Sequence, residues 1–156
     1  ARAVVYALGR NGWEVRVLAR REEQAAQLIY EITQSFSGDC RLTFGQISDE
    51  ILSKYGDCDL LVNTTPLGMY PKIQACPWPK DIPLPGQAAV YDLIYNPFET
   101  ILVARARAEG RLAAGGAGML ISQAALAFQR WTGLDAPFDV MERAFFEPKP
   151  TQMGVD

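Results

Sequence analysis

A run of apolar residues ends in three small polar side chains, Asn63, Thr64 and Thr65, and a Pro/Gly turn follows them. In an open α/β sheet, ligands bind in the crevice outside the carboxyl ends of the strands. The amide, hydroxyl and backbone groups of these three residues are suited to bind a ligand there. The pattern therefore predicts a ligand-binding turn, with an ordinary capped loop as the alternative.

Two arginines, Arg20 and Arg21, follow an earlier apolar run. In a dinucleotide-binding fold, the residue about 20 positions after the glycine-rich turn contacts the adenosine ribose, and the arginines reach that position if the turn lies just before Ala1. A guanidinium cannot accept a hydrogen bond from a ribose hydroxyl but can bind a 2′-phosphate, so NADP is favoured over NAD. The alternative is that both arginines are only solvated on a loop. Glu22 and Glu23 are expected in the first turn of the next helix, where the helix dipole favours carboxylates.

The composition excludes several classes of site. The 156 residues include no histidine, and the three cysteines, Cys40, Cys58 and Cys76, have no C-x-x-C spacing. The sequence therefore contains almost none of the side chains that a metal site or a Ser/His or Cys/His nucleophile pair would need. The net charge of −3 predicts no binding to nucleic acid or to an anionic membrane. Free thiols, with no signal peptide and no apolar run of transmembrane length, predict a cytoplasmic protein whose cysteines are buried as small hydrophobic residues.

Apolar runs of strand length alternate with segments of helical period, which is typical of repeated βα units around a parallel sheet. We expect an α/β fold, a doubly wound parallel sheet in three layers. The expected strands are residues 13–19, 42–44, 59–63, 89–93 and 112–114, and the expected helices are residues 2–9, 22–35, 49–55, 98–109, 117–131 and 140–146. Clustered prolines predict a long irregular loop at residues 70–86. One domain is expected at residues 1–147, followed by a polar, frayed tail at 148–156.

The sequence opens on a segment of helical pattern, residues 2–9, with no strand before it. A dinucleotide-binding fold begins with a strand and a G-x-G-x-x-G turn, which places the pyrophosphate at the N-terminus of the first helix. We therefore expect the first strand and the glycine-rich turn to be absent from this sequence. In the usual strand order 3-2-1-4-5-6, the absent strand is the central one, between residues 13–19 and 59–63.

Four segments together resemble a known family. They are A-R-R-E-E-Q-A from residue 19, N-T-T-P-L-G-M from residue 63, Y-D-L-I-Y-N-P-F-E-T from residue 91 and G-G-A-G-M-L-I-S-Q-A-A-L-A-F-Q-R-W-T-G from residue 115. In this order they are similar to the NADP-binding half of the shikimate dehydrogenases, over residues 1 to about 146. The resemblance implies a Rossmann-like domain of an oxidoreductase whose cofactor is NADP.

The resemblance implies a phosphate site at the first of these segments. Arg20 stands at the phosphate-binding arginine of the family segment N-R-T-x-x-R-A, and Arg21 stands at its threonine. Ala19 and Gln24 depart from that segment and remove an asparagine and a second basic group. The phosphate would therefore be bound by Arg20, with Arg21 as a second contributor.

The resemblance also implies the remaining cofactor contacts. Thr65 would line the dinucleotide cleft, and Asn63 would shape its turn. Leu93 would pack near the nicotinamide, Gly116 would bring a backbone carbonyl to the carboxamide, and Met119 would cover the face of the ring.

Tyr95 and Gln123 are the two positions that the resemblance directs to shikimate, through a phenol hydroxyl near the carboxylate and an amide near a ring hydroxyl. Without the resemblance, Tyr95 would be a loop residue and Gln123 an exposed helix residue. None of the four lysines matches a catalytic position of the family. The resemblance therefore implies that the catalytic Lys and Asp belong to a substrate domain outside this sequence, and that this chain alone is inactive.

The implied activity is the reversible NADPH-dependent reduction of 3-dehydroshikimate to shikimate, on the route to chorismate and the aromatic amino acids, by hydride transfer. Three alternatives stay open: a quinate/shikimate dehydrogenase of broader specificity, a non-catalytic regulator that senses shikimate or NADP, and another NADP-dependent Rossmann reductase. The expected partner is a small-molecule substrate, and a homodimer is the candidate assembly.

Overall fold

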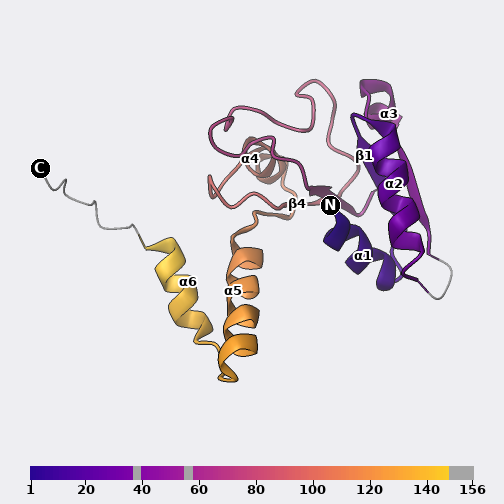
Figure 1. Cartoon of the computed structure of the whole chain (residues 1–156). Coiled ribbons are helices and arrows are strands. Elements are labelled where there is room, and N and C mark those ends of the chain that lie inside the picture. Colours follow the sequence, from indigo (N-terminus) through magenta and orange to yellow (C-terminus); the bar gives the residue numbers. More distant parts are fainter. Residues whose placement is uncertain (37–39, 55–57, 148–156) are drawn as a thin grey trace, which may run out of the picture.

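The computed structural model describes residues 1–36, 40–54 and 58–147. Helices and strands alternate along most of this length (Figure 1). The helices are α1 (Arg2–Arg10), α2 (Glu22–Thr33), α3 (Asp49–Lys54), α4 (Ile101–Ala108), α5 (Ala117–Thr132) and α6 (Phe138–Phe146). The strands are β1 (Val15–Ala19), β2 (Leu42–Gln46), β3 (Leu60–Asn63), β4 (Ala89–Asp92) and β5 (Ala113–Ala114). Every expected element is therefore confirmed in its type, and the predicted tail at 148–156 lies outside the described residues.

Two helices begin at residues other than the expected ones. Helix α4 begins at Ile101 and not at residue 98, because Thr100 is its N-cap and accepts the Val103 N–H at 3.3 Å from Oγ1. Helix α6 begins two residues earlier than expected, at Phe138, directly after Pro137. Proline fixes a backbone angle compatible with the start of a helix, which the apolar period alone does not reveal.

All strand pairs are parallel, as predicted. Strands β1 and β2 form one sheet, and β3, β4 and β5 form a second sheet in that order. No strand among the described residues lies between β1 and β3, the two strands that were expected to flank an absent central strand. Each sheet therefore has an unpaired edge at this position, and a groove separates the two edges.

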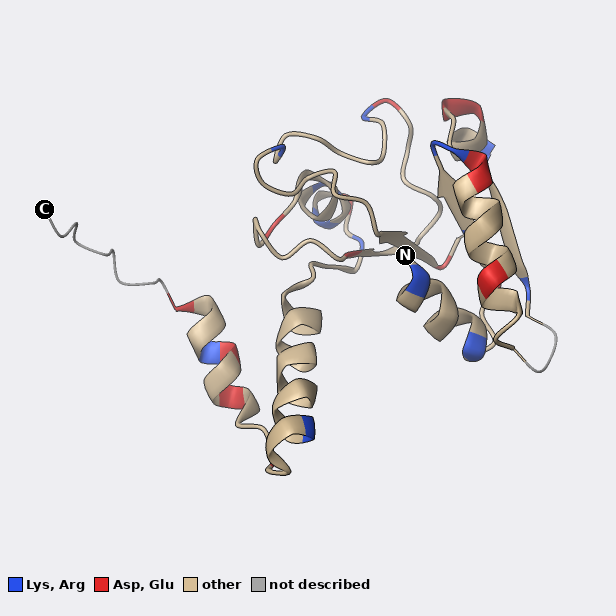
Figure 2. Cartoon of the chain, viewed as in Figure 1, with Lys and Arg blue, Asp and Glu red and all other residues tan. Residues whose placement is uncertain are grey.

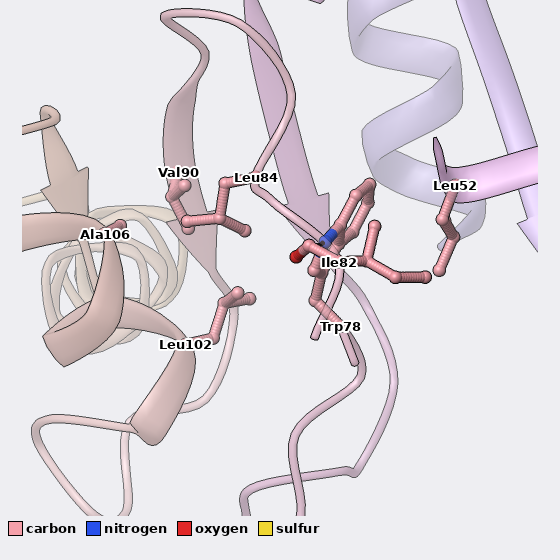
Figure 3. Close-up of a cluster of buried hydrophobic side chains, with 7 residues drawn as sticks. All are labelled: Leu52, Trp78, Ile82, Leu84, Val90, Leu102 and Ala106. Carbon is pink, nitrogen blue, oxygen red and sulfur yellow. Dashed lines mark hydrogen bonds between the residues drawn. The ribbon is translucent and has the colours of Figure 1, made fainter. Parts of the chain in front are cut away.

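Many of the buried hydrophobic side chains fall into two clusters, one beside the first sheet and one that reaches from the second sheet to α3 and to Leu18 of β1. The first joins α1, α2 and β1, and its buried members are Val5, Ile29 and Ile32. The second centres on Trp78 and is drawn in Figure 3, with Leu52, Ile82, Leu84, Val90, Leu102 and Ala106 as its other buried members. Trp78 is only 5% exposed, and its Nε1 donates to the Ile82 carbonyl at 3.1 Å. The proline-rich loop thus supplies a large share of the second core.

The loop at residues 70–86 contains no helix or strand, as predicted, but two arginines from outside it hold its backbone. Arg105 on α4 donates to the carbonyls of Pro79 at 2.9 Å and Ile82 at 2.7 Å. Arg111, which follows α4, donates to the carbonyl of Leu84 at 3.1 Å. These bonds satisfy carbonyl groups that a strand or helix would otherwise have paired.

Helices α5 and α6 form a hairpin that extends away from the sheets (Figure 1). Figure 2 shows that α5 is nearly free of charge, and Arg130 is its one charged residue. At the other end of the hairpin, Phe145 and Phe146 contact Phe98, with ring centroids 5.4 and 5.6 Å apart. No helix in the described parts of the chain is long and apolar enough to cross a membrane.

The three cysteines are unpaired and half-buried, whereas full burial was expected. Cys58 lies two residues before β3, and Cys76 packs at the margin of the Trp78 core, so each keeps one side open to solvent. Burial raises the pKa of both thiols despite opposing hydrogen bonds from neighbouring backbone groups.

Candidate functional site

The groove between β1 and β3 has a volume of about 580 Å³. Its walls are mostly apolar and come from β1, β3, α1 and the proline-rich loop. Its lining also includes the polar residues Asn63, Thr64 and Thr65, together with Ala1 at the start of α1. The N-terminus of a helix favours negative charge, so the lining of the groove combines hydrogen-bonding groups with a helix dipole that attracts anions.

The turn after β3 is held by the side chain of Asn63, which is 4% exposed. Its Oδ1 accepts hydrogen bonds from the Thr65 backbone N–H at 2.9 Å and from the Thr65 hydroxyl at 2.8 Å. Its Nδ2 donates to the Leu67 carbonyl at 3.3 Å. The Thr65 hydroxyl also accepts the Leu67 N–H at 3.2 Å, so the turn is fixed before any ligand binds.

The ends of β4 and β5 are joined to this turn through backbone hydrogen bonds. The Leu93 N–H donates to the Asn63 carbonyl at 3.1 Å, and the Gly116 N–H donates to the Ile94 carbonyl at 2.8 Å. A Cβ on Gly116 would stand 2.2 Å from the Leu93 carbonyl oxygen. The chain can take this path only because residue 116 has no side chain.

Helix α5 begins at this close approach. The Gly116 carbonyl accepts the Leu120 N–H at 3.0 Å, which uses one of its two lone pairs. Met119 is half-buried in the first turn, and Gln123 lies one turn further along the same helix face. Gln123 is exposed, as is Tyr95 at 42% on the segment after β4.

Arg20 and Arg21 lie at the carboxyl end of β1, in the other sheet. Both side chains are exposed, and among the described residues neither guanidinium has a hydrogen bond or an ion pair. The backbone is nevertheless fixed, because the Arg20 carbonyl accepts a hydrogen bond from Gln46 Nε2 at 3.3 Å and Arg21 is the N-cap of α2. Two free cations at a fixed strand end are available to an anionic ligand.

The predicted site residues therefore form three groups. Asn63, Thr65, Leu93 and Gly116 are brought together by the contacts at the ends of β3, β4 and β5. The two arginines end β1 in the separate sheet. Tyr95, Met119 and Gln123 extend from the strand ends without hydrogen bonds from their side chains to other described residues.

Two buried polar residues beneath this arrangement, Asp92 and Thr100, were not predicted from the sequence. Asp92 is fully buried at the end of β4 and accepts hydrogen bonds from Asn63 Nδ2 at 3.0 Å and from the Thr100 hydroxyl at 2.7 Å. A carboxylate that ends an apolar strand was a usable signal, since such a group is rarely buried without dedicated partners.

The described residues contain no group of three or more acidic or cysteine side chains that could hold a metal ion. The turn at Asn63 and Thr65 offers hydrogen-bonding groups and the two exposed arginines offer positive charge, a combination that suits an anionic organic ligand.

Comparisons with known proteins agree with one family. A family model described as the Shikimate 5'-dehydrogenase C-terminal domain matches residues 116–144. The shikimate dehydrogenase (NADP(+)) of Methanopyrus kandleri is 38% identical over 147 residues, which is 94% of this chain and 51% of that protein.

Two solved structures are similar over 92% of this chain. One is a shikimate 5-dehydrogenase from Thermus thermophilus in complex with NADP(H) and shikimate, 34% identical, with a TM-score of 0.73 over 49% of that chain. The other is a quinate dehydrogenase from Corynebacterium glutamicum in complex with NAD, 28% identical, with a TM-score of 0.79 over 50% of that chain.

The chain thus spans about half the length of the relatives that it matches, and the similarity covers more than nine-tenths of this chain. The fold is that of the Rossmann-like half of these enzymes. On this agreement of sequence, family model and structure, the chain belongs to the shikimate dehydrogenase family.

Proposed function

We propose that this chain forms the NADP-binding part of a shikimate dehydrogenase, which reduces 3-dehydroshikimate reversibly to shikimate with NADPH. The proposal rests chiefly on one observation, the joining of three strand ends at one sheet edge. Asn63 and Thr65, the Leu93–Tyr95 segment and Gly116 meet there through short backbone and side-chain contacts. In open α/β folds this edge is where dinucleotides bind.

Two features support the fit of the cofactor. Arg20 and Arg21 follow the strand at the position where a dinucleotide fold contacts the adenosine ribose, and among the described residues their guanidinium groups have no partner. A 2′-phosphate would supply the negative charge to pair with them. The absent side chain at Gly116 lets the Leu93 segment pack directly against the start of α5, which supports a preformed arrangement of the segments that face the cofactor.

In this proposal the candidate site residues of the chain bind or orient the two ligands. Arg20 binds the 2′-phosphate, and the fixed turn at Asn63 and Thr65 lines the dinucleotide cleft. Leu93, Met119 and the second lone pair of the Gly116 carbonyl orient the nicotinamide.

On the substrate side, the exposed phenol of Tyr95 and the exposed amide of Gln123 hold the carboxylate and a ring hydroxyl of shikimate. When bound, NADP supplies hydride transfer at the nicotinamide ring. The proton-transferring Lys and Asp are proposed to come from the half of the relatives that this chain does not match.

The cofactor assignment is tested in a chimera in which this chain replaces the matching half of the Methanopyrus kandleri relative. Arg20→Ala should weaken NADP binding by about 1.5–3 kcal/mol, the usual value of a hydrogen bond to a charged group, and should leave NAD nearly unaffected. That corresponds to a loss of roughly 10- to 150-fold in NADP affinity. The readout is the ratio of kcat/KM for NADPH and NADH.

Arg21→Ala is the matched control, because Arg21 is the adjacent exposed arginine and replaces a threonine of the family segment. Arg21→Ala should lose less NADP affinity than Arg20→Ala. Equal losses for both cofactors in Arg20→Ala would mean that Arg20 stabilises the loop and does not read the phosphate.

The similarity to an NAD-bound quinate dehydrogenase supports one second candidate, a quinate/shikimate dehydrogenase of broader specificity. The same chimera separates the two by its kcat/KM for quinate and shikimate. Binding of both ligands without turnover would instead favour a sensor of shikimate or NADP.

A further inference from the structure

Three polar or charged side chains are buried among the described residues, and all three belong to one cluster. They are Asn63, Asp92 and Thr100, each at most 4% exposed, and we call them the Asp92 cluster. Asp92 is its centre. Oδ1 accepts hydrogen bonds from Asn63 Nδ2 at 3.0 Å and from the Ile94 N–H at 3.1 Å, and Oδ2 accepts the Thr100 hydroxyl at 2.7 Å.

A buried carboxylate is a costly way to fill this space. Transfer of the group from water is unfavourable, and apolar side chains of similar volume usually stabilise a core at least as well. In this cluster every buried polar side-chain atom has a partner, as it does throughout the described residues. Such a fully paired polar group is best suited to fix one arrangement of the segments around it.

The two carboxylate oxygens serve different segments. Through Asn63, Oδ1 reaches the turn that contains Thr65, because Asn63 Oδ1 accepts both the backbone N–H and the hydroxyl of Thr65. Through Ile94, Oδ1 also fixes the residue before Tyr95.

The Ile94 carbonyl in turn accepts the Gly116 N–H at 2.8 Å, at the start of α5. The Oδ2 oxygen has a separate partner. It binds the hydroxyl of Thr100, which caps α4.

We propose that Asp92 is a positioning residue. Its Oδ1 fixes the turn that contains Thr65, on the cofactor side, relative to the segment of Ile94 and Tyr95, on the substrate side. This inference rests on the proposed function, because it takes Thr65 and Tyr95 to lie on opposite sides of the reacting pair. One buried atom then sets the affinity for both ligands. The Oδ2 bond serves the stability of α4.

Asp92→Asn tests this role with almost no change in volume. If the new NH₂ group faces Asn63 and Ile94, a donor meets two donors. If it faces Thr100, the hydroxyl must turn from donor to acceptor, and the two Oδ1 bonds survive with a neutral acceptor that binds about half as strongly. In either orientation the two segments are held more weakly.

In the chimera defined above, Asp92→Asn should raise KM for NADP and KM for shikimate together, each by roughly fivefold. Asp92→Ala should raise both further. Thr100→Val is the matched control, because it removes the Oδ2 bond and the cap of α4 but leaves both Oδ1 bonds. Thr100→Val should lower Tm about as much as Asp92→Asn does, and should leave both KM values within about twofold of the wild type.

Two results would overturn the proposal. One is that Asp92→Asn lowers Tm while both KM values stay at the wild-type level. The other is that Thr100→Val raises the KM values as much as Asp92→Asn does. If Asp92→Ala does not fold, the comparison of Asp92→Asn with Thr100→Val still tests the positioning role of Asp92.

Amide hydrogen exchange in the full chain provides a readout that does not depend on activity. Asp92→Asn should speed exchange of the Thr65 and Ile94 amides, whose acceptors are Asn63 Oδ1 and Asp92 Oδ1. Thr100→Val should not. A chimera that fails to reduce 3-dehydroshikimate would refute the proposed function, whereas unchanged exchange at both amides in Asp92→Asn would refute the positioning role.

Discussion

Gly116→Ala adds a single methyl group at the most crowded backbone position of the site. Its Cβ would stand 2.2 Å from the carbonyl oxygen and 2.5 Å from the carbonyl carbon of Leu93, and 3.2 Å from the carbonyl carbon of Ile94. These are backbone atoms, so no flexible side chain can move aside. The two segments must separate, which strains the 2.8 Å bond from the Gly116 N–H to the Ile94 carbonyl.

The cost of this change follows from its parts. Overpacking in a well-packed region costs about 1–3 kcal/mol, and a weakened hydrogen bond adds about 0.5–1.5 kcal/mol. Alanine is also a poorer N-cap than glycine, and Gly116 is the N-cap of α5. We expect Gly116→Ala to lower the free energy of unfolding by about 2–4 kcal/mol, and to impair NADP binding in the chimera.

Gly118→Ala is the matched control two residues further along. An added Cβ there meets no atom within 4 Å, and the residue lies in the first turn of α5. Because alanine is the better helix former by up to about 1 kcal/mol, this variant should be neutral or slightly stabilised.

Urea denaturation of the two variants beside the wild type, followed by far-UV circular dichroism, measures the difference. Gly116→Ala within about 0.5 kcal/mol of wild type would refute the close-approach argument, as would equal losses in both variants.

Two further predictions concern the Trp78 core and the arginines around it. Trp78→Ala should lower the free energy of unfolding by about 3–5 kcal/mol, because it empties a buried site, and Trp78→Phe should cost clearly less; equal losses would mean that the hydrogen bond to Ile82 and not the packed volume dominates. Burial raises the pKa of Glu109, but hydrogen bonds from Arg105 and Arg111 outweigh it and leave that pKa lowered in the folded chain. The stability from this lowered pKa is present above the ordinary Glu value of about 4.3 and is lost as the pH falls through the lower folded pKa. Glu109→Gln should therefore flatten the fall of Tm between about pH 5 and pH 3, and an unchanged slope would contradict the role of this carboxylate.

The sequence by itself determined the type and approximate position of every helix and strand in the described residues. Apolar periods of two and of 3.6 residues are local properties, and prolines and glycines mark where they end. The same local signals predicted the irregular loop at residues 70–86 and the position of Arg20 at the end of β1. Family-specific motifs added the fold and the family, which the comparisons confirm.

Only the tertiary structure decided which of these pieces meet. Asn63 and Asp92 are 29 positions apart, and their contact depends on the parallel register of β3 and β4, which pairs these two residues directly. The need for glycine at position 116 likewise arises from Leu93 on a different segment. Trp78 lies in a proline-rich loop and becomes part of a core only because side chains of distant segments, among them Leu102 and Val90, belong to the same buried cluster. Contacts of this kind depend on packing between distant segments, and no pattern of neighbouring residues encodes them.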